Sequence, residues 1–166
     1  MLADFPTFAR YNAWANQRLY AAVATLSEGD YVRPRRAFFS SLQGTLNHIY
    51  LVDLLYQDRL EGRKTAIKRL NQVLAPELAK LRAAHAALDG WYIGAMDAMP
   101  VERLQQPFPF HTIPDNVYLD LPLEVCLTNL YQHQIHHRGQ AHNMLSQVGM
   151  DPPPLDFILF KHESHG

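Results

Sequence analysis

Histidines gather near the C-terminal end of the chain, where the stretch YQHQIHHRGQAH, residues 131–142, holds four of the nine histidines. His133 and His137 are four residues apart, and residues with this spacing lie one above the other on one face of a helix. Two imidazoles placed in this way can chelate one metal ion from one side. His136 points in another direction, so we expect at least one of these three histidines to have a different role.

A third ligand must come from elsewhere in the chain, and His48 is the best candidate because it lies beside an apolar stripe that includes Leu46, Ile49 and Val52. That stripe would turn His48 towards the interior. The alternative without a metal is that His133 and His137 lie on an exposed polar face of the helix and that His48 is a hydrogen-bonded core residue. The sequence predicts surface, loop or tail positions for the remaining histidines, which are His85, His111, His142, His162 and His165.

Several common catalytic motifs are absent. Gln134 follows His133, so the H-E-x-x-H zinc-protease motif is not present. The chain has no Glu-x-x-His pair for a carboxylate-bridged di-iron bundle. It also lacks phosphate-binding glycine loops and the G-x-S-x-G elbow. The single cysteine, Cys126, excludes an intrachain disulfide and a thiolate cluster, and we expect it to be a small buried residue.

Composition describes an ordinary globular protein. Of the 166 residues, 48% are hydrophobic and 19% are charged, and the formal net charge is −1. We therefore expect one domain over residues 1–166 and no nucleic-acid partner, which would require a basic face. No leader pattern and no long apolar run are visible, so we expect a cytoplasmic protein with no membrane association.

Hydrophobic residues recur at helical spacing in four long stretches. Leu42, Leu46 and Ile49 illustrate this period, and Ser40 or Ser41 can cap their helix. Gly90 and Gly94 fall inside another stretch and suggest a close helix contact or a bend. We expect helices over approximately residues 4–26, 41–61, 75–99 and 122–148.

A proline-rich segment, PFPFHTIPDNVYLDLP, separates the last two expected helices. It contains β-forming residues on both sides of a turn signal at residues 113–116, which favours a short irregular hairpin there. The fold class predicted from these elements is all-α. The expected architecture is a four-helix bundle with a long crossover between the third and fourth helices.

Several segments together resemble the DinB/YfiT-like family of metalloenzymes. HQIHHRGQ at 133–140 is similar to the family motif H-x-x-x-H-[RK]-G-Q, and RYNAWANQRL at 10–19 is similar to its first-helix signature. The second helix, 41–62, and the segment after the last helix also match. These matches occur in the expected order and cover nearly the whole chain.

This resemblance implies an up-down-down-up bundle in which His48, His133 and His137 bind a divalent metal, most often nickel or zinc. It also implies a homodimer and thiol-dependent chemistry on a small molecule, as in family S-transferases and an isomerase that use low-molecular-weight thiols. The substrate does not carry over, because the segment 107–121 matches no pattern that indicates one.

Three neutral histidines leave coordination positions open, as in catalytic zinc sites. A bound water can then reach a pKa of about 7, and a bound thiol is held as the thiolate. Three hypotheses follow. The protein activates a thiol or water against a small electrophile, or it is a metal-dependent hydrolase without a thiol cofactor, or it is a non-enzymatic metal-binding protein of the stress response.

Other residues are candidates for the surroundings of the site. Asn129 lies one turn before His133 and is a candidate partner for a histidine ring, and Gln140 is another neighbour on the same helix. Trp14 is a possible pocket residue, although core packing is its commoner role. Asn12 and Asn16 are candidates for the same pocket, although solvent exposure is their commoner role. We expect Arg138 to form an ion pair with Asp156. The carboxylates of a thiol cofactor would require basic side chains, and the loops offer Arg33, Arg35, Arg36 and Arg103.

Overall fold

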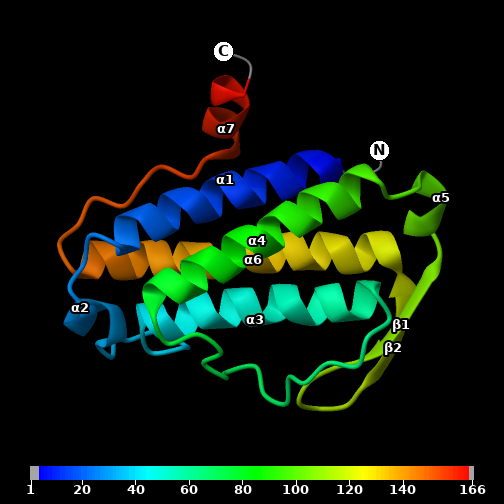
Figure 1. Cartoon of the computed structure of the whole chain (residues 1–166), viewed down its shortest axis with the longest axis horizontal. Helices are drawn as coiled ribbons and strands as arrows, with labels where there is room; N and C mark the ends of the chain where they lie inside the picture. The colour runs from blue at the N-terminus through cyan, green and yellow to red at the C-terminus, as the bar shows by residue number, and fades with distance from the viewer. Residues whose placement is uncertain (1–3, 165–166) are drawn as a thin grey trace.

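Four long helices form the body of the protein (Figure 1). The computed structural model describes residues 4–164. The long helices are α1 (Phe5–Val23), α3 (Leu42–Leu60), α4 (Leu78–Asp97) and α6 (Leu123–Gln147). In Figure 1, α1 and α6 run in one direction, whereas α3 and α4 run in the other. This is the up-down-down-up arrangement, so the prediction of an all-α four-helix bundle is confirmed.

Local sequence explains where these helices begin and end. The side chain of Asp4 accepts a hydrogen bond from the Thr7 amide at the start of α1, and Ser41 does the same for the Gly44 amide at the start of α3. Both are preferred N-cap residues. Gly149 follows α6 with a φ of 79°, a left-handed conformation that glycine adopts without strain.

The connections between the helices have different lengths and shapes. Because α3 and α4 are parallel, the segment 61–77 must return along the length of the bundle (Figure 1). The short helices α2 (Glu28–Val32) and α5 (Val101–Leu104) lie in the connections that follow α1 and α4. The predicted hairpin is present as β1 (Pro107–His111) and β2 (Tyr118–Pro122), which pair antiparallel. After α6, the chain continues to α7 (Phe157–Glu163) beside α1.

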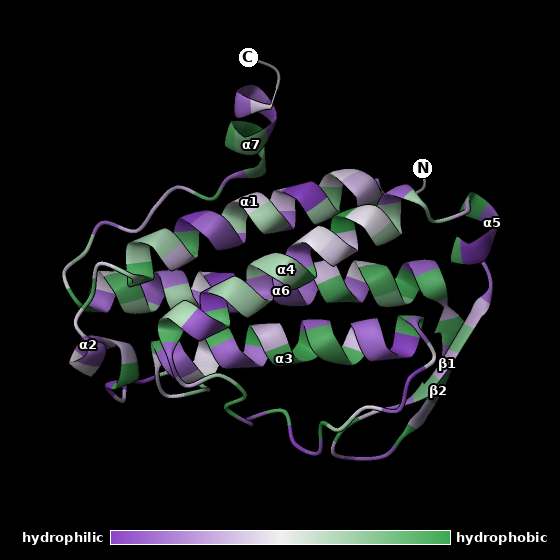
Figure 2. Cartoon of the chain, viewed as in Figure 1, coloured by the Kyte–Doolittle hydropathy of each residue, from purple (hydrophilic) through white to green (hydrophobic). Residues whose placement is uncertain are grey.

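Hydrophobic and hydrophilic residues alternate along the long helices, as expected for elements with one buried face (Figure 2). The apolar core divides into two main clusters, one around Leu55, Leu127 and Leu130 and the other around Leu46 and Leu145. Along each long helix, polar buried residues lie at or near the boundary between these clusters.

Two further features concern the helices themselves. A Cβ added at Gly90 or Gly94 would meet no atom within 4 Å, so the expected close helix contact there is wrong. Both glycines face open space, so no close packing of another helix requires glycine at either position. Across residues 4–164, none of the helices combines the length and hydropathy required to span a bilayer.

Candidate metal centre

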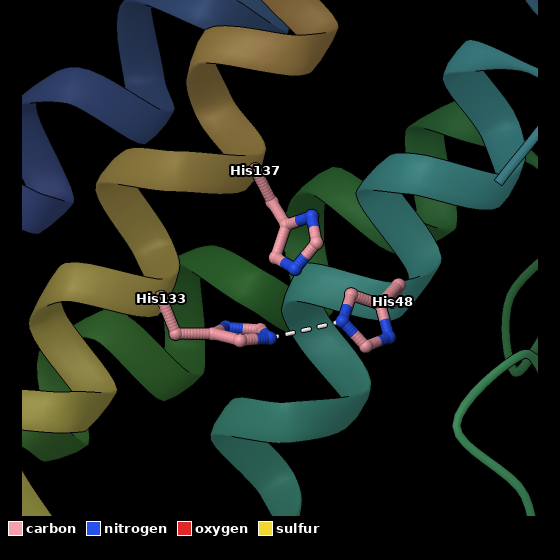
Figure 3. A group of neighbouring side chains, drawn as sticks. All are labelled: His48, His133 and His137. Atoms are coloured by element: carbon pink, nitrogen blue, oxygen red, sulfur yellow. Dashed lines mark hydrogen bonds between the residues drawn. The ribbon is translucent and has the colours of Figure 1, made fainter. Parts of the chain in front are cut away.

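Three histidines converge where α3 packs against α6 (Figure 3). His48 comes from α3, and His133 and His137 come from successive turns of α6. One ring nitrogen from each lies within 4.8 Å of the others, and the Nε2 atoms of His48 and His133 are 2.9 Å apart. The structure therefore brings together the three residues selected as ligands from the sequence.

Hydrogen bonds fix the tautomers of two of these rings. His48 Nδ1 lies 2.7 Å from the carbonyl oxygen of Leu70, which can only accept, so Nδ1 carries the proton. His137 Nδ1 similarly donates to the side-chain oxygen of Gln140 at 2.8 Å. In both neutral rings, Nε2 is left with a lone pair. Metal-binding histidines usually donate their second nitrogen to such a partner.

Gln140 also accounts for His136. Its amide nitrogen lies 3.1 Å from His136 Nε2, while its side-chain oxygen accepts a hydrogen bond from His137 Nδ1. His136 is exposed and is not part of the group of three potential ligands. His136 therefore orients the side chain of Gln140, and Gln140 in turn orients the ring of His137.

Burial keeps the three imidazoles neutral. It lowers the pKa of His48 to about 4, although the bond to Leu70 opposes this shift. It lowers the pKa of His133 to about 3, with help from the neighbouring histidines, and it also lowers the pKa of His137. Neutral imidazole is the form that binds metals, so no proton has to leave these rings at neutral pH.

The donor set fits a borderline divalent ion. Imidazole suits zinc, nickel and copper, whereas calcium and magnesium prefer oxygen ligands. Nitrogens bound to one tetrahedral zinc lie roughly 3.3 Å apart, given Zn–N bonds of about 2.0–2.1 Å. The separation of 2.9 Å and the limit of 4.8 Å bracket this value. Nδ1 of His133 is buried and has no hydrogen-bond partner within residues 4–164.

A pocket of about 740 Å³ opens directly onto the three histidines. This volume lies in the usual range for small-molecule sites. Phe39 forms one wall, and its ring stacks on His48 with centroids 3.9 Å apart and an interplanar angle of 22°. The remaining lining residues are Phe38, Arg69, Leu70, Asn71, Pro114, His136 and Gln140.

Gly44 allows Phe39 to approach the site so closely. A Cβ at this position would clash with the carbonyl oxygen of Phe39, which is a backbone atom and cannot simply rotate away. Glycine in the first turn of α3 is therefore required for the loop to pack onto that helix. The loop in turn brings the Phe39 ring to His48.

The segment 61–77 supplies three pocket residues that sequence reasoning missed, namely Arg69, Leu70 and Asn71. The loop has no hydrophobic period, and only the parallel direction of α3 and α4 brings it past the histidines. The basic residues named from the sequence, Arg33, Arg35, Arg36 and Arg103, do not line this pocket.

Comparison with known proteins identifies the family. The DinB family profile matches residues 1–165. The chain belongs to the DinB family. Protein DinB of Bacillus subtilis (strain 168) is 26% identical over 156 residues, which cover 90% of this chain and 89% of that protein.

A solved structure of the same fold is YfiT from Bacillus subtilis, described as "a probable metal-dependent hydrolase with an unusual four-helix bundle topology". It superposes with a TM-score of 0.66 at 13% sequence identity, and the match covers 86% of each chain. This likeness shows that the DinB-family fold assigned here is shared with YfiT.

A second polar group lies deeper in this DinB-family bundle and explains residues that the sequence analysis placed wrongly. His85 is only 1% exposed, so its predicted place on a surface or loop is wrong. Its Nε2 lies 2.9 Å from a carboxylate oxygen of Asp53, and its Nδ1 lies 2.9 Å from the Tyr20 hydroxyl. Both ring nitrogens are thus engaged within the protein. Asp89 lies close by and completes a buried group of three potential ligands.

Arg138 provides the balancing charge in this second group. It is buried and donates to the side-chain oxygens of Asn12 and Asn16, so the predicted ion pair with Asp156 is wrong. Asn16 donates to both oxygens of Asp89, at 3.1 and 3.2 Å. The two asparagines are 4% and 2% exposed, which overturns their expected solvent exposure.

The pKa shifts in this buried network follow from its charges. Burial raises the pKa of Asp53 and Asp89, and it lowers that of Arg138. Burial also acts to lower the pKa of His85, but the two carboxylates outweigh it and the net shift is upward. When all four groups are ionised, two positive charges balance two negative ones. The hydrogen bonds between residues of different helices indicate a structural network.

The other candidate neighbours lie away from the histidines. Trp14 packs against Phe160 of α7, and its indole nitrogen donates to Glu163 at 2.8 Å, so it is not part of the pocket. Asn129 donates to the Tyr56 hydroxyl at 3.1 Å and not to a histidine of the site. Cys126 is a buried core residue, as expected. His165 lies outside the described residues.

Proposed function

We propose that this protein is a metal-dependent enzyme in which His48, His133 and His137 hold one divalent ion, nickel or zinc, and a small electrophile is attacked in the adjoining pocket. The observation that carries this proposal is the convergence of three neutral imidazoles at the floor of an open pocket. Closed structural zinc sites usually have four protein ligands, whereas catalytic ones have three.

When bound, the ion supplies Lewis-acid chemistry, which lowers the pKa of a water or thiol and polarises an electrophile. The chain's own residues orient the ligands and shape the space around them. The Leu70 carbonyl and the Gln140 side chain hold two imidazoles in the tautomer that presents Nε2. Phe39 covers the face of His48 and limits the approach of water from that side.

Water and a low-molecular-weight thiol are the two candidate nucleophiles. The description of YfiT as a probable metal-dependent hydrolase supports water. The volume of the pocket, about 740 Å³, supports the thiol, because it is large enough for a small-molecule cofactor beside the ion. A non-enzymatic metal-binding role would require an ion with no exchangeable position. A homodimer and a cytoplasmic location are separate proposals.

Elemental analysis of the purified protein tests the metal site. We expect about one nickel or zinc ion per chain in the wild type, and loss of that ion in His48→Ala and His133→Ala. His111→Ala is the matched control, because this histidine is exposed on β1 and should leave the metal content unchanged. A wild type that takes up neither added nickel nor added zinc would sink the proposal.

Activity assays then separate the two nucleophiles. A panel of activated esters and amides is supplied without thiol, and a panel of alkylating electrophiles is supplied with glutathione or a related thiol. Turnover that depends on His133 in the first panel identifies a hydrolase, whereas turnover in the second identifies a transferase. A metal-loaded protein with no exchangeable water in a cobalt-substituted spectrum or relaxation measurement would contradict both.

A further inference from the structure

We infer that the pocket beside the three histidines takes a small organic anion, a carboxylate carrying a flat apolar body, as the substrate. This inference rests on the proposed function, because the bound ion would share the pocket with that molecule. It is carried by three features of the lining: its charge, an unpaired guanidinium, and an aromatic wall.

The charge of the pocket is positive. No aspartate or glutamate is among the pocket-lining residues, so nothing in the lining would compensate the charge of a bound divalent ion. Arg69 adds a further positive charge. Opposite charges attract strongly in a partly enclosed site, so an anion is favoured over a neutral molecule of the same shape.

Arg69 is free to bind that anion. Its guanidinium forms no hydrogen bond or ion pair with any of residues 4–164, whereas Arg63 in the same loop pairs with Asp58 and Glu61. A guanidinium presents several donors in a planar fork that matches a carboxylate. Asn71, two residues along, adds amide donors at the same side of the pocket.

Hydrogen bonds in the loop hold the backbone at Arg69 close to the histidine site. The backbone amides of Lys68 and Arg69 both donate to the side-chain oxygen of Gln72, at 2.7 and 2.8 Å. The carbonyl oxygen of the next residue, Leu70, accepts a hydrogen bond from His48 Nδ1. The anion-binding group is thus one residue away from the backbone atom that orients a metal ligand.

The apolar part of the lining suits a flat apolar body. Phe38 is 82% exposed, an unusual position for a large aromatic side chain. Its ring meets Phe39 edge-on, with centroids 4.8 Å apart, and Leu70 and Pro114 extend this apolar lining. The guanidinium and these rings line one pocket, so a molecule that carries both a carboxylate and a flat apolar body matches its lining.

The inference is tested with two probes of the same shape, 4-phenylbutyrate and its uncharged amide. Their binding is followed by ¹H–¹⁵N NMR titration of the metal-free protein and of the zinc-loaded protein. We expect the acid to bind about tenfold more tightly than the amide in the metal-free wild type, the size of a charge-assisted hydrogen bond. Zinc loading should widen this preference.

Two variants separate the contribution of Arg69 from general charge. Arg69→Gln should abolish the preference for the acid in the metal-free protein, whereas Lys68→Gln removes one charge from the neighbouring position and should keep it. Phe38→Ala should weaken both probes, because it removes the apolar wall and leaves the guanidinium. Circular dichroism of each variant confirms that it is folded.

The outcomes are distinct. Equal affinity for acid and amide in the wild type, no saturable binding of the acid, or an unchanged preference in Arg69→Gln would each overturn the inference. Failure of the proposed function would appear elsewhere, as absence of bound metal in the elemental analysis. The titration of the metal-free protein is independent of that result.

Discussion

Arg138→Met should destabilise the protein much more than the same change at an exposed arginine. Arg138 is 2% exposed. It donates to Asn12 and Asn16, and Asn16 in turn donates to Asp89, so these residues form one buried network. Removing one charge from such a network leaves an uncompensated buried carboxylate. Breaking a buried pair in this way typically costs about 3–5 kcal/mol.

Arg10→Met is the matched control. Arg10 binds both carboxylate oxygens of Asp97, at 2.8 and 2.7 Å, but the two side chains are 46% and 44% exposed. Exposed pairs contribute about 0–1 kcal/mol even when their geometry is good. At roughly 2–4 °C per kcal/mol for a chain of this size, we expect the melting temperature to fall by about 6–20 °C for Arg138→Met, against about 4 °C or less for Arg10→Met.

Urea unfolding of metal-free protein, followed by circular dichroism, measures both losses without a contribution from bound metal. The double variant Arg138→Met, Asp89→Asn removes the opposed charges together and should recover part of the lost stability, because the two sites share partners. If Arg138→Met costs no more than Arg10→Met, the network does not stabilise the fold as argued. A double variant whose losses simply add would contradict the coupling.

Three further predictions concern the histidine site. Gln140→Leu should weaken zinc binding about 10- to 100-fold in a chelator competition, while Gln132→Leu, on an exposed face of the same helix, should not. Gly44→Ala should cost about 1–3 kcal/mol by thermal melting, because the loop backbone must move, whereas Gly90→Ala fills open space and should be neutral or slightly stabilising. The pKa of His133 is about 3 in the folded protein and about 6.5 in the unfolded chain, so the unfolded chain binds the proton first. The metal-free protein should therefore lose stability as the pH falls from about 6.5 to about 3, and His133→Leu should flatten that dependence. An equally steep pH profile of stability in the variant would contradict the assignment.

The sequence predicted the helices and the hairpin because these depend on local period and turn chemistry. Apolar residues three and four apart, capping side chains and prolines act within a few residues of where they stand. The same local rule placed His133 and His137 on one face. His48 was selected because its apolar neighbours turned it inward. The structure brings these three together, and metal binding itself stays a prediction.

The buried network was not predictable in the same way. Asn12, Asn16 and His85 have polar side chains that are usually exposed, and their burial is possible only because partners on other helices satisfy them. Nothing near them in the sequence indicates those partners. Arg69 was missed for a related reason, since a loop without a period gives no direction until the helices it connects are placed.

The two sets of residues on α6 serve different faces of one helix. His133 and His137 are four residues apart on α6, and Gln134 and Arg138 have the same spacing. Each member of the second pair follows one of the histidines, so the second pair is rotated by about 100° around the helix axis from the first. The second pair faces the core, where Gln134 donates to Asp53 and Arg138 to the asparagines of α1. These bonds resist rotation of α6, and the direction of the two histidines depends on that rotation. A change in the network that leaves the helices folded but lets α6 turn should therefore lower metal affinity without altering a ligand.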